Sequence, residues 1–153
     1  MKKPTCIDCL RDGITTVRKI DSRSGPRSPR CTTHMRAKKK ATRARAHGRH
    51  IEAEFGMSSE VYWMMYEAQG GRCWICRIAT GKGKRLTIDH DHNCTEGHPP
   101  ERGCPMCWRG LICSYDNVLI GRRGPDALRR AADYLENPPA RKILAELRAK
   151  TRS

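Results

Sequence analysis

The chain has 153 residues, 37% of them hydrophobic, with a formal net charge of +15 and a sequence pI of about 9.9. That length fits one domain or two very small ones, and so polar a chain buries too little apolar surface to be stable without further help. We find neither an apolar run long enough to cross a membrane nor a secretory stretch near Met1. The strong positive charge indicates a polyanionic partner, most simply nucleic acid.

Nine cysteines and six histidines supply candidate metal ligands. Disulfides are the competing explanation, but an intracellular chain keeps its thiols reduced and more often uses paired thiols to bind metal. We therefore expect a cytoplasmic protein that is stabilised by zinc.

Residues 1–35 predict an N-terminal zinc-knuckle module. Two short-spaced pairs lie on either side of a Ser-, Arg-, Gly- and Pro-rich loop that offers little for a core. Tetrahedral zinc accepts such a set of three thiolates and one imidazole. The pairs are Cys6 with Cys9 and Cys31 with His34.

Residues 36–55 predict a basic helical linker, because Lys, Arg and Ala favour helix. Its apolar seam is too narrow to bury a wide face, so its cations are expected to contact DNA phosphates. These cations are Arg36, Lys38, Lys39, Lys40, Arg43, Arg45 and Arg49. A solvated spacer helix and a disordered basic arm stay open as alternatives.

The segment after Ser59 predicts a packing helix that Gly70 and Gly71 end. Its buried face is expected to comprise Val61, Met64, Met65 and Ala68. Residues 86–92 then predict a strand, and a second apolar segment leads into Cys113.

Residues 124–153 predict two short C-terminal helices with apolar stripes. The first is expected to bury Leu128, Ala131, Ala132 and Leu135. The stripes either close the fold or form a dimer contact.

The chemistry concentrates in the run from Asp89 to His92 and in the stretch from Cys113 to Asn117. A carboxylate on Asp89 and a side-chain carbonyl on Asn117 are hard ligands that suit Mg²⁺, and His90 can take a proton from water near neutral pH. Adjacent strand residues point to opposite faces, so Asp89 and His90 can share one site only at a strand end, a bulge or a strong twist.

Three motifs together resemble the phage recombination endonuclease VII family, which belongs to the His-Asn-His nucleases. They are Gln-Gly-Gly-Arg-Cys-x-x-Cys at 69–76, Leu-x-Ile-Asp-His-Asp-His at 86–92, and Arg-Gly-Leu-Ile-Cys-x-x-x-Asn at 109–117. The resemblance covers about residues 56–135. The N-terminal module before a basic helix is similar to an extension of actinobacterial-phage members.

This resemblance implies a small, zinc-stabilised α+β fold around a ββα-metal nuclease core at residues 56–123. The core would carry an inserted Cys/His knuckle at 93–108 and would be followed by the C-terminal helices. Asp89 and Asn117 would hold a catalytic Mg²⁺ or Mn²⁺, and His90 would be the general base. His92 would position the phosphate, and Arg109 would contact the DNA backbone or pack structurally.

One position departs from the family pattern, because Asp116 stands where the last zinc cysteine is usual. Zinc accepts carboxylate oxygen, so a weaker closed site is still expected. Its ligands would be Cys73, Cys76, Cys113 and Asp116. This partition leaves a complete third set in the insert, namely Cys94, His98, Cys104 and Cys107. By spacing alone, Cys73 and Cys76 could instead share a zinc ion with Cys104 and Cys107.

The resulting functional hypothesis is a divalent-metal-dependent DNA endonuclease of the junction-resolving type, acting on double-stranded or branched DNA in the host cytoplasm. Two active sites would suit a branched substrate, hence a homodimer. A nicking or homing-type nuclease with the same core is one alternative, and a non-catalytic zinc-ribbon DNA-binding protein is another. An iron or redox protein would give no role to the Asp-His run or to the charge.

Overall fold

The computed structural model describes residues 5–151. The chain forms two compact units, Met1–Glu60 and Val61–Ser153. Among the described residues, no helix is long and apolar enough to span a lipid bilayer.

The N-terminal unit is built around sulfur atoms. Its buried cluster consists of Cys6, Cys9 and Cys31, with Ile14 and Ile20 packed against it. The short helix α1 (Ile7–Arg11) follows the first cysteine, and an isolated bridge pairs Ile20 with Cys31. So small an apolar core cannot stabilise a unit of this size by burial alone, which is consistent with a metal-dependent module.

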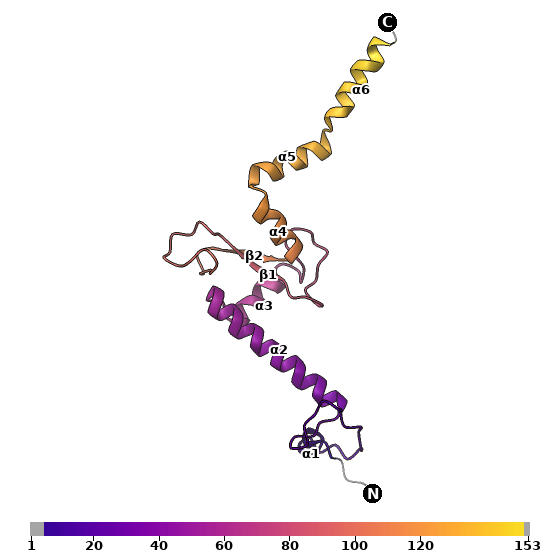
Figure 1. Cartoon of the computed structure of the whole chain (residues 1–153), viewed down its shortest axis with the longest axis vertical. Helices are drawn as coiled ribbons and strands as arrows, with labels where there is room; N and C mark the ends of the chain where they lie inside the picture. The colour runs from indigo at the N-terminus through magenta and orange to yellow at the C-terminus, as the bar shows by residue number, and fades with distance from the viewer. Residues whose placement is uncertain (1–4, 152–153) are drawn as a thin grey trace. The chain divides into compact units, whose positions relative to one another are not determined.

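Helix α2 (Thr32–Phe55) runs without interruption from this cluster (Figure 1). It begins four residues before the predicted linker, so His34 lies in its first turn, and the left-handed Gly56 ends it. Every residue from 36 to 46 is exposed, whereas Gly48 and Ile51 are buried. The linker is therefore a helix and not a disordered arm.

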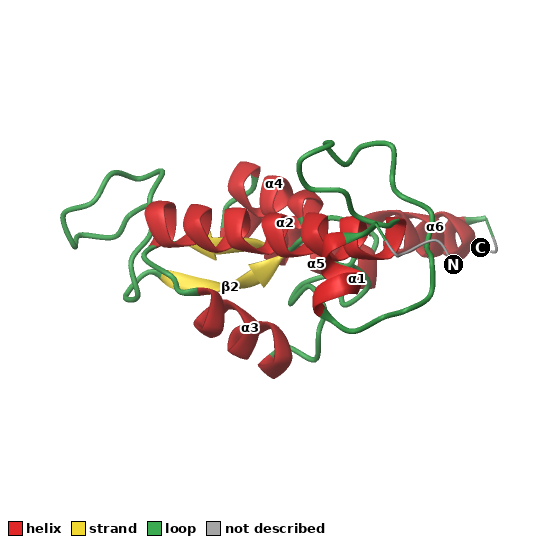
Figure 2. Cartoon of the chain, turned by 90° about the horizontal axis from the view of Figure 1, so that it is seen from below, coloured by secondary structure: helices red, strands yellow, loops and turns green. Residues whose placement is uncertain are grey.

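The C-terminal unit contains a two-stranded antiparallel sheet and a following helix (Figure 2). Strand β1 (Thr87–His90) pairs with β2 (Trp108–Ile112), and α4 (Ser114–Arg122) contacts β1. Strand β1 ends two residues earlier than predicted. Residues 91–107 form an inserted loop that joins the strands, and Trp108 belongs to β2 and not to the insert.

Helix α3 (Ser59–Ala68) has the predicted period, but its buried face is shifted by one residue. Val61, Met64 and Ala68 are exposed, and Tyr62 is the buried residue. The reason is a hydrogen bond, because the Tyr62 hydroxyl donates to the carbonyl of Leu86 at 2.9 Å. An aromatic residue that reaches a buried carbonyl gains both burial and a hydrogen bond, which the methionines cannot match.

Gln69 extends this contact from α3 to the sheet. Its amide donates to the carbonyl of Leu111 and accepts from the Leu111 N–H, both at 2.8 Å. The buried side chain thus pairs with β2 as a neighbouring strand would, and it shares the Leu111 carbonyl with the Trp74 N–H.

The C-terminal helices are α5 (Pro125–Glu136) and α6 (Pro139–Lys150), and neither contains a buried residue. The prediction that α5 buries its apolar stripe was therefore wrong. Leu128 is partly covered, whereas Ala131, Ala132 and Leu135 are exposed. Within the described part of the chain these stripes do not close the fold.

Candidate functional site

A β-bulge lies opposite Asp89 and His90 at the end of β1. Asp89 pairs with Gly110 and His90 pairs with Trp108, so Arg109 is an extra residue on the opposite strand. A bulge interrupts the alternation of faces and increases the local twist. The structural condition for a shared site is thus met, at the very end of β1.

Asp89 is a buried carboxylate with one cationic neighbour. Its Oδ2 atom lies 3.7 Å from the Arg109 guanidinium, which also contacts Asp91 at 2.9 Å. Burial raises the pKa of Asp89, and the Arg109 guanidinium, followed by the His90 and His92 side chains, opposes that rise. Arg109 is half exposed and shared between two carboxylates, so it compensates the buried charge only in part. A cation with a higher charge density would be favoured here.

His90 is held on two sides. Its Nε2 atom lies 3.0 Å from the carbonyl oxygen of Pro100 in the inserted loop. Its ring stacks on His92, with ring centroids 4.5 Å apart. His90 is buried and His92 is exposed, so the pair reaches from the interior to the surface.

Asn117 lies in the first turn of α4, where its N–H donates to the carbonyl of Cys113. Because α4 contacts β1, this helix places Asn117 on the element next to the strand that carries Asp89. The order of strand, strand and helix therefore gathers the predicted catalytic residues in one unit.

The predicted zinc ligands gather in three groups, in each of which the ligand atoms all lie within 4.8 Å of one another. These groups have the memberships preferred from the sequence. Cys104 and Cys107 group with Cys94 and His98, and not with Cys73 and Cys76 as spacing alone would allow. Together the groups offer thiolate, imidazole and carboxylate donors, which is the chemistry of zinc.

In the first group the Nδ1 atom of His34 faces the sulfurs of Cys6, Cys9 and Cys31 at 3.2, 3.4 and 3.5 Å. The other ring nitrogen lies 3.4 Å from the carboxylate of Asp12. A ligating histidine commonly donates its second N–H to such a carboxylate, which fixes the ring.

The thiols of this group have divergent acidities. Burial raises the pKa of Cys6, but hydrogen bonds from backbone amides and His34 together lower it to about 6. Burial and the neighbouring sulfurs raise the pKa of Cys9 to about 11. Sulfurs this close cannot all ionise unless a cation lies among them, so the donor set fits a bound divalent metal.

In the second group the carboxylate of Asp116 stands among sulfurs. Its Oδ2 atom accepts from Cys73 at 3.0 Å and from Cys113 at 3.1 Å. Burial raises the pKa of Asp116, but hydrogen bonds from the thiols together outweigh burial and lower it. Burial also raises the pKa of Cys113, to about 11. Asp116, the residue that differs from the family pattern, is thus placed as a fourth ligand would be.

The third group pins the inserted loop. The sulfurs of Cys94 and Cys104 lie 3.8 Å apart, and the Cys107 sulfur lies 3.7 Å from Nε2 of His98. The loop carries almost no buried apolar side chain besides Cys107, so these four side chains are its internal support.

Three contributors to the site had not been predicted from the sequence. The Pro100 carbonyl touches His90 through the backbone, a contact with no signal in residue type. Asp12 and Gln69 act through hydrogen bonds to groups distant in sequence. The role of Asp12 could have been suggested by its position three residues after the ligand Cys9.

The sequence matches a known family and known phage proteins. Residues 48–137 match the model of the family described as Recombination endonuclease VII. The chain is 38% identical to the Gene 59 protein of Mycobacterium phage D29 over 148 residues, which cover 95% of this chain and 81% of that protein. It is 36% identical to the Gene 59 protein of Mycobacterium phage L5 over the same shares. No solved structure matches. The family match spans the sheet, the inserted loop and α4, and the chain belongs to the recombination endonuclease VII family.

Proposed function

We propose that this protein is a divalent-metal-dependent DNA endonuclease that cleaves branched DNA in the cytoplasm of the host cell. Family membership supports a nuclease. The observation that supports the rest is that a buried carboxylate and a buried imidazole, Asp89 and His90, lie at the end of β1 opposite a bulge and on the strand that α4 contacts.

In this mechanism Asp89 and Asn117 hold Mg²⁺ or Mn²⁺, which when bound stabilises charge on the scissile phosphate and its leaving oxygen. His90 accepts the proton of the attacking water. His92, exposed and stacked on His90, orients the phosphate. Arg109 balances the two aspartates and contacts the DNA backbone.

The three Cys/His/Asp groups hold structural zinc in this proposal. Cys6, Cys9, Cys31 and His34 stabilise the N-terminal module. Asp116 with its three cysteines stabilises the core around α4.

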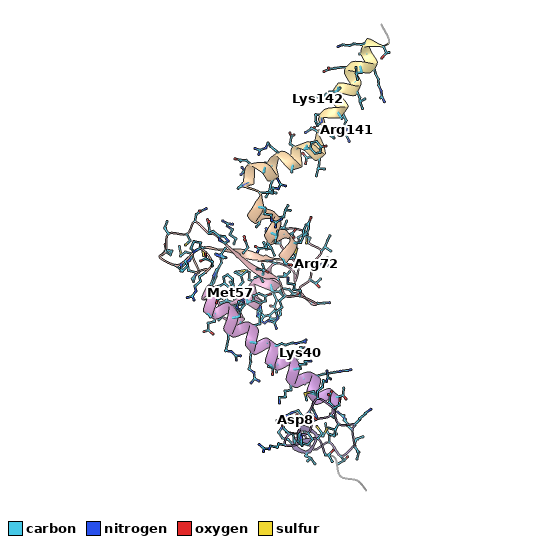
Figure 3. The ribbon with its side chains drawn as sticks, in the orientation of Figure 1. Asp8, Lys40, Met57, Arg72, Arg141 and Lys142 are labelled. Atoms are coloured by element: carbon cyan, nitrogen blue, oxygen red, sulfur yellow. The ribbon has the colours of Figure 1, made fainter. Side chains whose placement is uncertain are left out.

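Helix α2 contacts DNA phosphates in a manner that does not depend on sequence. Its cations between residues 36 and 46 are all exposed, among them Lys40 (Figure 3). Phosphate contacts of this kind position a protein on DNA and make its affinity depend on salt.

A homodimer would provide two active sites for a branched substrate. The apolar side chains of α5 and α6 are exposed, among them Leu135, Ile143, Leu144 and Leu147. Light scattering coupled to size exclusion tests this part: a monomer at every concentration used for cleavage would remove it.

The function itself is tested by cleavage of a four-way junction and of the matching linear duplex, with and without added Mg²⁺. Omitting Mg²⁺ is preferable to adding a chelator, which would also remove zinc. Faster cleavage of the junction, only with Mg²⁺ present, is the expected result. Equal cleavage of both substrates would indicate a nicking or homing-type enzyme, and binding without cleavage in Mg²⁺ and Mn²⁺ would indicate a non-catalytic DNA-binding protein.

A further inference from the structure

The inserted loop touches the proposed catalytic base through Pro100, the second of two successive proline residues. Pro99 and Pro100 lie between the group members His98 and Cys104. Proline fixes one backbone dihedral, so this stretch is stiffer than an ordinary loop. A stiff segment tied near both of its ends can hold a carbonyl group in a set direction.

The two carbonyl groups of this segment face two different histidines. The Pro99 oxygen lies 3.0 Å from Nδ1 of His98, whose Nε2 faces the sulfur of Cys107. The Pro100 oxygen lies 3.0 Å from Nε2 of His90. One imidazole belongs to the metal-ligand group and the other to the catalytic site, and two adjacent residues join them.

A carbonyl oxygen can only accept a hydrogen bond, so each facing ring nitrogen must carry the proton. For neutral His90 this fixes the tautomer with hydrogen on Nε2. The lone pair is then on Nδ1, which is the basic nitrogen of the neutral ring in this tautomer. The orientation of the ring and the identity of its basic nitrogen thus depend on where Pro100 is held.

The other side of the inserted loop is tied to the same strand end. The Asp91 N–H, next to His90, donates to the carbonyl of Cys107 at 2.9 Å. Cys107 is the last member of the ligand group and directly precedes β2. The group is therefore connected to the end of β1 both through Pro100 and through Cys107.

We propose that the group of Cys94, His98, Cys104 and Cys107 positions His90 through the Pro100 carbonyl, so that its integrity sets the rate of the chemical step and not the affinity for DNA. This inference rests on the proposed nuclease function. It makes Pro100 a positioning residue and gives the insert a role beyond its own stability.

Two variants separate positioning from folding. C104S removes a ligand of the group, and P99G/P100G keeps all four ligands and both carbonyls but loosens the segment between them. We expect single-turnover cleavage of a junction to fall by about tenfold in P99G/P100G and by up to about 100-fold in C104S, as for other groups that orient a site from outside it. Junction affinity should stay at the wild-type value in both variants, and zinc content should fall only in C104S.

M106A is the matched control, because the Met106 side chain is exposed on the same loop and belongs neither to the ligand group nor to the proposed catalytic site. It should cleave like the wild type. Wild-type rates in P99G/P100G and C104S, or losses explained entirely by weaker binding, would overturn the inference.

The tautomer of His90 gives a readout that needs no activity. Long-range ¹H–¹⁵N correlation spectra of the zinc-loaded protein without Mg²⁺, assigned with His90→Gln, should show hydrogen on Nε2 in the wild type and a mixture of tautomers in P99G/P100G. Hydrogen on Nδ1 in the wild type, or the same tautomer in both proteins, would contradict the inference. A wild type that cuts no DNA would defeat the proposed function alone, because the spectra would still test the positioning of His90.

Discussion

Asp116 shows how one residue can change the character of a metal site without displacing its neighbours. Its carboxylate occupies the space among Cys73, Cys76 and Cys113 that a fourth sulfur would fill. Oxygen is a harder donor than thiolate and competes less well for a borderline-soft ion such as zinc. The residue type therefore predicts a weaker site, although the grouping is intact.

Asp116→Cys should consequently bind zinc more tightly. The expected result is slower release of one zinc equivalent to a colorimetric chelator, together with a higher melting temperature, because metal bound only by the folded state stabilises it. The release of the remaining zinc serves as the internal reference. Faster release of that equivalent would mean that the carboxylate is the better fourth ligand in this geometry.

Gly48 is a second residue whose identity has a steric reason. A Cβ atom at this buried helical position would lie well inside contact distance of the Ser59 hydroxyl oxygen. Gly48→Ala should therefore destabilise the protein by about 1–2 kcal/mol in the wild-type background, because the clash exceeds the helix-propensity gain of about 1 kcal/mol. Denaturant unfolding measures the change.

The same substitution in a Ser59→Ala background should be neutral or stabilising, since the clashing oxygen is gone. Equal effects in the two backgrounds would show that the close approach of Gly48 and Ser59 does not determine the residue.

At the scale of elements, the long helix α2 separates charge from packing. Its middle, from residue 36 to 46, is exposed on all sides, and its buried positions lie beyond that segment. An element that buries nothing over three turns contributes little to stability through its side chains, so its charge is available for a ligand.

Replacing Lys38, Lys39 and Lys40 by Gln should weaken DNA binding irrespective of base sequence. The slope of log affinity against log salt should become shallower by about 0.9 for each phosphate that these lysines no longer neutralise. A matched control changes three exposed cations of α6 to Gln, namely Arg141 and Lys142 (Figure 3) and Lys150. If both triple variants behave alike, net charge and not binding by α2 would explain the affinity.

Helix α3 shows why the sequence predicted an element but not its buried face. Tyr62, Met65, Tyr66 and Gln69 have the same helical spacing as the predicted set. Hydrophobicity alone favours the methionines, whereas the choice is made by carbonyl groups of Thr80, Leu86 and Leu111 that need donors. Such partners come from distant segments and leave no local pattern.

At the scale of the whole molecule, the ligand groups were the most predictable feature, because short spacings between cysteines and histidines reflect the reach of side chains around one ion. The meeting of Asp89 and His90 could be stated only as a geometric condition. The bulge that satisfies it depends on the partner strand, where Arg109 is the extra residue. The predicted burial of the α5 stripe was wrong, since an amphipathic stripe does not reveal whether the surface that covers it belongs to the same chain.

The two units of the molecule differ in the source of their stability. The N-terminal unit buries a cluster of three cysteines and also Ile51 and Met57, whereas the C-terminal unit buries Tyr62, Leu86, Ile88 and Leu111 around its small sheet. A sheet of two strands is marginal by itself, so α3, α4 and the metal-ligand groups must support it. The proposed catalytic residues Asp89, His90 and Asn117 lie on that supported sheet and its following helix.

The most direct test of the proposed chemistry compares single-turnover cleavage of a four-way junction in Mg²⁺ by the wild type, His90→Ala and His50→Ala. His50 is an exposed histidine outside the proposed site, so its variant controls for the loss of an imidazole. We predict a loss of about 10²–10⁴-fold in the rate for His90→Ala, with unchanged junction affinity and a wild-type rate for His50→Ala. Cleavage by His90→Ala at the wild-type rate would contradict the assignment of His90 as the general base.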